Sequence, residues 1–204
     1  MNRLQEVANA LTQLIPSIVC LIEAVSRRGR LPVHAWVLMI SVWLHLPFSF
    51  FYHVRCALRY DDCQFDAVRC WSRRLDNTFI HISATCIAYG TSHGSLPYVG
   101  LCAMFNLAAA ATHWRKEIHM VRNQRFTLVA IILYIAPIAW RRDLRNLLGA
   151  LAGLFPAGFI FRTYIFGGYS HAIFHLFVSC LAYYVMRAAL TPTLDVHSPF
   201  VDFH

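Results

Sequence analysis

The sequence predicts an all-α membrane protein built as a seven-transmembrane-helix bundle. Two observations carry this prediction. The chain of 204 residues is 58% hydrophobic and only 14% charged, a balance that soluble domains of this size rarely show. Its apolar residues gather in seven runs, each close to the roughly 20 residues that a helix needs to cross a hydrocarbon core of about 30 Å. We therefore expect a single domain over residues 1–204.

The expected helices follow one another with short polar or basic connections between most of them. Their approximate ranges are 8–25, 32–54, 76–92, 96–114, 124–140, 146–161 and 169–187. The first run departs most from an ideal span, because it contains Gln13 and Glu23 and is interrupted by Pro16. The third run is expected to begin at Asp76, since a carboxylate at a helix N-terminus meets free backbone amide groups. In the sixth run, Gly149 and Gly153 have the spacing that favours close packing against a neighbouring helix.

The charge distribution favours a membrane surface over a nucleic acid. The formal net charge is +8, but the basic residues lie in short clusters between apolar runs, where they serve as anchors facing anionic lipid headgroups. No basic surface interleaved with aromatic residues is present, so we expect no nucleic-acid partner. The excess of arginine on the N-terminal side of the expected bundle places the N-terminus in the cytoplasm, and the sequence does not indicate which cellular membrane holds the protein.

A histidine pair opens the seventh expected helix. His171 and His175 are four residues apart and therefore share one face of a helix. The pair alone fits either a metal site or packing within a bundle. Counting helices brings Ser49 and His53, from the end of the second helix, and Asp76, from the start of the third, to the same membrane face. Ionisable groups inside a membrane bundle are energetically expensive and mark functional sites.

The residue types in this group suit a metal-assisted reaction. Three histidines supply the neutral ligands of an open zinc site, which keeps its fourth position for water or substrate. Asp76 would then accept a proton from that water, and Ser49 would orient a ligand or donate to a developing oxyanion. Two simpler interpretations stay open, in which Asp76 only caps its helix and Ser49 only bonds its own backbone.

Other polar residues have weaker claims on the site. Asp61, Asp62 and Asp66, in the long connection before the third helix, offer alternative carboxylates. His45 shares a face with Ser49 and His53 but lies roughly 12 Å deeper at 1.5 Å per residue. We therefore expect His45 to be a core or cavity histidine and not a ligand.

These motifs resemble those of the CREST superfamily of seven-helix membrane proteins. The resemblance rests on Ser49-x3-His53, on Asp76 and on His171-x3-His175. The superfamily includes alkaline ceramidases, the progestin and adipoQ receptors with the haemolysin III proteins, GPI-anchor-remodelling phospholipases and the myomaker-like proteins. Residues 170–178 are similar to the last helix of the adipoQ-receptor branch. The connection between His53 and Asp76 is longer than in the family pattern.

The resemblance implies a function as well as a fold. It implies a Zn2+ ion on His53, His171 and His175, with Asp76 and Ser49 as catalytic residues. The reaction would be hydrolysis of a lipid amide or ester, in which zinc-bound water attacks the carbonyl, and a ceramide-like membrane lipid would be the substrate. The alternative is a non-enzymatic seven-helix receptor or membrane-remodelling protein with a structural zinc site.

Overall fold

The computed structural model describes residues 2–27, 30–58, 70–117 and 119–192. Over these ranges the chain forms helices joined by turns, without strands, so the prediction of an all-α protein is confirmed. The helices are α1 (Arg3–Thr12), α2 (Leu14–Ser26), α3 (Val33–Ala57), α5 (Trp71–Thr91), α6 (Leu96–Thr112), α7 (Met120–Trp140), α8 (Leu144–Thr163) and α9 (Ser170–Leu190), with the short 3-10 helix η1 (Gly167–Tyr169) before α9.

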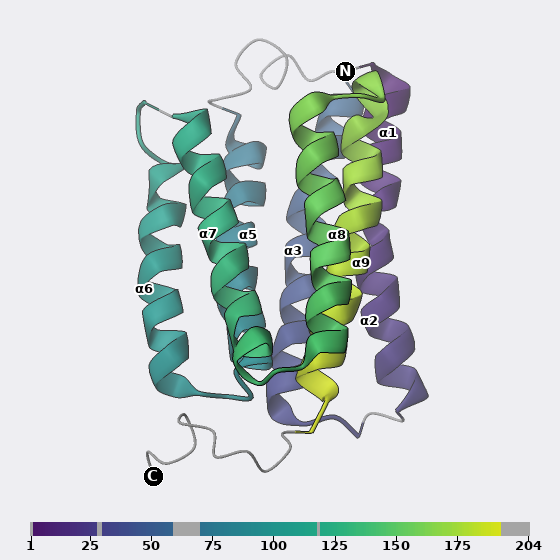
Figure 1. Ribbon diagram of the computed structural model, residues 1–204. Coiled ribbons are helices and arrows are strands. Elements are labelled where there is room, and N and C mark those ends of the chain that lie inside the picture. Colours follow the sequence, from purple (N-terminus) through teal and green to yellow (C-terminus); the bar gives the residue numbers. More distant parts are fainter. Residues whose placement is uncertain (1, 28–29, 59–69, 118, 193–204) are drawn as a thin grey trace.

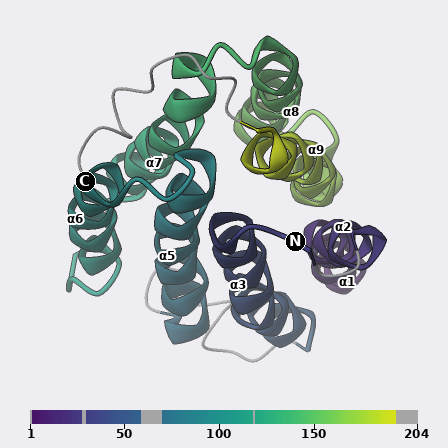
Figure 2. The ribbon, with the colours of Figure 1, turned by 90° about the horizontal axis from the view of Figure 1, so that it is seen from below.

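The helices run side by side along one common direction (Figure 1). Viewed along that direction, their contacts close a ring in which α1 and α2 are followed by α3, α5, α6, α7, α8 and α9 (Figure 2). The ring closes where α9 packs against α1 and α2, so helices from the two ends of the sequence become neighbours. This closure places the end of α3 and the start of α9 against α1.

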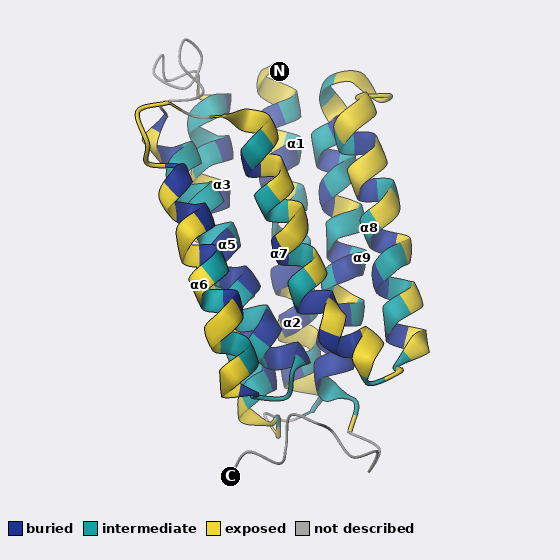
Figure 3. Ribbon diagram, turned by 60° about the vertical axis from the view of Figure 1, so that its left-hand side comes forward, coloured by how far each residue is buried: buried dark blue, intermediate teal, exposed yellow. Residues whose placement is uncertain are grey.

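Five segments are long and apolar enough to cross a membrane, which is consistent with a multi-pass membrane protein. They are Arg3–Ser26, Val33–Ala57, Met120–Trp140, Leu144–Thr163 and Gly167–Leu190. Many of the residues on the outward faces of the bundle are exposed (Figure 3), and large hydrophobic side chains are common among them. α6 is apolar but has only 17 residues, and α5 carries Arg73, Arg74 and Asp76 in its first turns. The count of seven transmembrane spans therefore stays a prediction for these two helices.

The first span is broken into α1 and α2. Pro16 lacks the backbone N–H that would bond the carbonyl of Thr12 four residues earlier, and the two helices meet at Gln13, directly after Thr12. Asn2 and Gln5 close the N-terminal end of α1 through a reciprocal capping box. α1 is thus a short, separately capped helix beside the starting turns of α9.

α5 begins five residues earlier than the sequence suggested. Its first residue is Trp71 and its N-cap is Cys70. The turn before Asp76 contains Ser72, Arg73 and Arg74, whose polarity keeps it out of any apolar run. Asp76 therefore lies in the second turn of α5 and is not positioned by free amide groups at the helix N-terminus. The other helices begin and end within five residues of the expected limits.

α8 and α9 pack so closely that two glycines on α8 have no room for a side chain. A Cβ atom at Gly149 would lie 2.3 Å from the ring of Tyr184, and one at Gly153 would lie 2.6 Å from the backbone nitrogen of Leu181. This agrees with the close packing that the spacing of the two glycines predicts. The contact matters for function because α9 carries two of the three candidate ligands.

Replacing Gly153 by leucine is expected to lower the apparent melting temperature of the purified protein in detergent. The new side chain meets the backbone of α9, which cannot rotate aside, and overpacking of this kind costs about 1–3 kcal/mol. Gly158→Leu is the matched control on the same helix, because no atom lies within 4 Å of a Cβ built there. Equal melting temperatures for the two variants would contradict the packing described for α8 and α9.

Candidate metal centre

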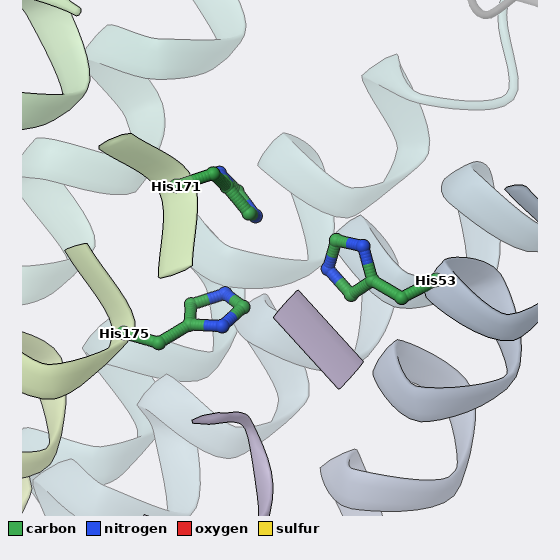
Figure 4. A group of neighbouring side chains, drawn as sticks. All are labelled: His53, His171 and His175. Atoms are coloured by element: carbon green, nitrogen blue, oxygen red, sulfur yellow. The ribbon is translucent and has the colours of Figure 1, made fainter. Parts of the chain in front are cut away.

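Three histidines converge at one end of the bundle. His53 lies in the last turns of α3, and His171 and His175 lie in the first two turns of α9 (Figure 4). One ring nitrogen from each lies within 4.8 Å of the other two, so the group can hold a metal ion. Nitrogens that share a tetrahedral zinc ion at about 2.0–2.1 Å are roughly 3.3 Å apart. A modest closing of the rings would therefore seat one ion.

The rings of two of these histidines are oriented by α1. Nδ1 of His53 lies 2.9 Å from Oε2 of Glu6. Nδ1 of His175 lies 3.2 Å from the carbonyl oxygen of Asn9 and 3.1 Å from the hydroxyl of Thr12. An Nδ1–H group that donates to an oxygen leaves Nε2 as the ligand atom, as in metal sites generally. α1 therefore sets which nitrogen of His53 and of His175 is available.

Glu6 is a buried carboxylate that the sequence analysis missed. It is only 6% exposed, and it accepts a second hydrogen bond from the amide nitrogen of Asn9 at 3.2 Å. The first expected helix began at residue 8, and this start excluded Glu6. The available signal was the spacing of Glu6, Asn9 and Thr12, which recur every three residues and form a polar stripe on a helix. A buried negative charge beside His53 favours a bound cation.

Replacing Glu6 by glutamine is expected to lower zinc affinity about 10–100-fold, because loss of an outer partner of a ligating histidine has effects of this size. Glutamine keeps the size of the side chain and an acceptor oxygen but removes the charge. Zinc affinity is measured by competition with a chromophoric chelator on purified protein. Glu23→Gln is the control, since Glu23 pairs with Arg27 and Arg187, outside the histidine group. The same affinity in both variants would contradict the role of Glu6.

Asp76 and Ser49 lie beside the histidines on α5 and α3. Oδ1 of Asp76 lies 3.0 Å from Nε2 of His45, and the carboxylate also interacts with Ser49. Ser49 lies one helical turn before His53 on α3, so its contact with Asp76 is at the same end of the bundle as the histidines. The alternative carboxylates Asp61, Asp62 and Asp66 lie outside the described residues.

His45 has a partner that the sequence analysis did not assign to it. His45 does not belong to the three-histidine group, as expected from its deeper position on α3. Its partner Asp76 lies farther along α5 than expected, because that helix starts at Trp71. Asp76 can therefore reach His45, which lies two turns before His53 on α3.

Aromatic side chains border the third histidine. The ring centroid of His171 lies 5.5 Å from that of Phe174 and 6.0 Å from that of Phe161, which comes from α8. His53 and His175 are buried, whereas His171 is partly exposed. α1 thus closes one side of the group, and His171 is the most exposed of the three histidines. Three neutral protein ligands are the number that an open metal site uses.

Comparisons of the chain with protein-family models, with curated proteins and with solved structures give no match. The interpretation of the site therefore rests on the chemistry of its residues.

Proposed function

We propose that the protein is a zinc-dependent intramembrane hydrolase of a lipid amide or ester, with a ceramide-like lipid as substrate. The observation that carries the proposal is the convergence of His53, His171 and His175 beside a carboxylate, Asp76, that does not belong to the ligand group. Three neutral imidazoles, two of them with rings oriented by α1, suit zinc better than the cations that prefer oxygen ligands. The negative charge of Glu6 offsets part of the charge of a divalent ion.

The residues divide the reaction between them. Bound zinc would supply Lewis acidity toward the lipid carbonyl and would lower the pKa of water to about 7. Asp76 accepts the proton of the attacking water and returns it to the departing amine or alkoxide oxygen. His45 and Ser49 both hydrogen-bond the carboxylate of Asp76 and hold it in place for this transfer. Ser49 donates its hydroxyl proton to the carboxylate of Asp76 and so orients the base, and it would donate to the developing oxyanion once Asp76 has taken up the proton of water.

The substrate reaches the site from the bilayer. α1 and α3 border an open apolar cavity of about 180 Å³, whose lining includes Val7 and Leu11 from one helix and Phe50 and Val54 from the other. The same two helices carry Glu6 and His53. We infer that the cavity holds part of an acyl chain while the amide or ester group lies near His171. In this proposal α5 and α6 complete a seven-helix transmembrane bundle with its N-terminus in the cytoplasm.

The test is release of free fatty acid from defined lipids by purified protein in detergent micelles. The panel contains a ceramide for amide cleavage and a phosphatidylcholine for ester cleavage. Zinc-loaded wild type is expected to release fatty acid from at least one of them, a chelator is expected to stop the release, and added zinc is expected to restore it. His119→Ala, a change at an exposed histidine, is expected to behave as wild type. No release by zinc-loaded wild type from either lipid would refute the proposal.

A second candidate function is a non-enzymatic receptor or membrane-remodelling protein with a structural metal. It is favoured by the position of the histidines, which join α3 to α9 and, through Glu6 and Asn9, to α1. A metal there would connect helices from both ends of the chain. Zinc-dependent thermal stability without fatty-acid release would support this second function.

A further inference from the structure

The apolar cavity between α1 and α3 also carries a positive charge. The buried residues Ala10 and Ala57 line it, together with more exposed apolar side chains from both helices. Among the described residues that line the cavity, Arg3 alone is charged, and it is exposed. A cavity that joins an apolar wall to a guanidinium group suits a molecule with an apolar chain and an anionic group.

Arg3 lies at one end of this cavity. It belongs to the first turn of α1, and Leu58, the C-cap of α3, lines the same end (Figure 1). Leu11 lies eight residues farther along α1, which is a rise of about 12 Å along the helix. The charge and the apolar lining are therefore separated along the helix axis, in the way that the headgroup and the acyl chain of a lipid are separated.

The guanidinium group of Arg3 is available to a ligand. Within the part of the chain that the structure describes, it forms no salt bridge and no side-chain hydrogen bond. The neighbouring carboxylate of Glu6 is bonded to His53 instead. Arginine stays charged at any physiological pH, and its planar fork of N–H groups matches the oxygens of carboxylates and phosphates. An anionic headgroup is therefore the partner that Arg3 fits.

Further basic residues lie at the same end of the bundle. In the described segments they are Arg55, Arg73, Arg74, Arg122, Arg125 and Arg162. Two of the carboxylates there, Glu6 and Asp76, are already hydrogen-bonded to histidines. This field repels the ammonium group of a zwitterionic headgroup. It attracts a phosphate monoester, which carries a charge of about −1.5 to −2 at neutral pH.

We propose that Arg3 selects a lipid with a phosphate monoester headgroup, a phosphorylated ceramide, for this cavity. The inference rests on the proposed function, because the acyl chain in the cavity is the one that hydrolysis releases. The guanidinium group donates hydrogen bonds to the phosphate oxygens. The phosphate is bound and not cleaved, and the amide bond remains the bond that water breaks. Arg3 is thus a specificity-determining residue and not a catalytic one.

The test is the binding of ceramide 1-phosphate with a fluorescent acyl chain, followed by fluorescence anisotropy. The full-length protein is used in a neutral detergent after a chelator has removed metal, and the same ceramide without phosphate is the reference. Wild type is expected to bind the phosphorylated lipid about 10-fold more tightly, which is the effect of a charge-assisted hydrogen bond. Arg3→Gln is expected to lose this preference. Arg3→Lys is expected to keep part of it, because lysine retains the charge without the planar fork.

Arg162→Gln is the matched control for the charge. Arg162 is an exposed arginine at the same end of the bundle, and it does not line the cavity. This variant is expected to keep the wild-type preference. Val7→Trp tests the chain-binding part, because the larger side chain fills the cavity and is expected to weaken the binding of both lipids equally. Val121→Trp, at an exposed valine on α7, is expected to bind both lipids as wild type does.

The inference is overturned if Arg3→Gln keeps the wild-type preference, or if Arg162→Gln loses it to the same extent. Displacement of the lipid by an equal concentration of inorganic phosphate would also overturn it, since the site would then bind any phosphate. The metal-free protein separates binding from hydrolysis. Preferential binding without fatty-acid release by zinc-loaded protein contradicts the proposed function and leaves the lipid site in place. Release from both ceramides at rates that Arg3→Gln does not change contradicts the selection by Arg3 alone.

Discussion

Replacing His175 by alanine is expected to remove the metal ion from the candidate centre. The variant loses one of three protein ligands, together with the hydrogen bonds that link α9 to Asn9 and Thr12 on α1. The loss of zinc affinity is expected to exceed the roughly 10–100-fold that follows removal of an outer partner. Elemental analysis of the purified protein measures the zinc content, and a chelator competition measures the affinity. His53→Ala and His171→Ala are expected to have the same effect.

His119→Ala is the control for these three variants, because His119 is exposed and belongs to no ligand group within the described residues. It is expected to retain the wild-type zinc content. The ligand assignment fails if any of the three histidine variants keeps the wild-type zinc content and affinity. Comparison of melting temperatures with and without zinc separates loss of a ligand from loss of folding, since a ligand variant that is still folded no longer responds to zinc.

Replacing Asp76 by asparagine is expected to lower the rate of lipid hydrolysis by about 10²–10⁴-fold, the usual contribution of a general base. Asparagine fills the same space and still accepts a hydrogen bond from His45, but it cannot take a proton at neutral pH. Zinc content is expected to stay at the wild-type level, because Asp76 does not belong to the three-histidine group. The rate of fatty-acid release from the best lipid of the panel measures the effect.

Asp143→Asn is the control at the opposite end of the bundle. Asp143 caps α8 by accepting from the backbone N–H of Asn146, and asparagine is an equally good N-cap. Hydrolysis and stability are both expected to be unchanged. If Asp76→Asn retains the wild-type rate while zinc is still required, Asp76 is not the general base of the reaction. Loss of both zinc and activity in that variant would instead make Asp76 part of the metal site.

The two predictions differ in which helix contact they probe. The histidine variants test the meeting of α3, α9 and α1, where the first and last helices pack together. Asp76→Asn tests the contact between α3 and α5, in which His45 and Ser49 face Asp76. If the metal is only structural, the histidine variants still lose zinc. In that case neither the wild type nor Asp76→Asn hydrolyses lipid.

The amino-acid sequence by itself determined the helical class and the group of three histidines. Long apolar runs in a bilayer form helices, because a helix bonds every backbone polar group within its own segment. Counting the turns of these runs then brings His53, His171 and His175 to one end of the bundle, since each residue advances a helix by about 1.5 Å. The number of spans is not determined in this way, because short or partly charged helices such as α5 and α6 give a weak apolar signal.

Only the tertiary structure decided which residues surround the histidines. Glu6, Asn9 and His45 act through contacts between helices, and the rotation of one helix against another is fixed by packing and not by its own apolar pattern. The break at Gln13 gives α1 its own position beside α9, and the early start of α5 moves Asp76 into reach of His45. The three ligands could be predicted from their positions in the sequence. The partners that orient them depend on how the ring of helices closes.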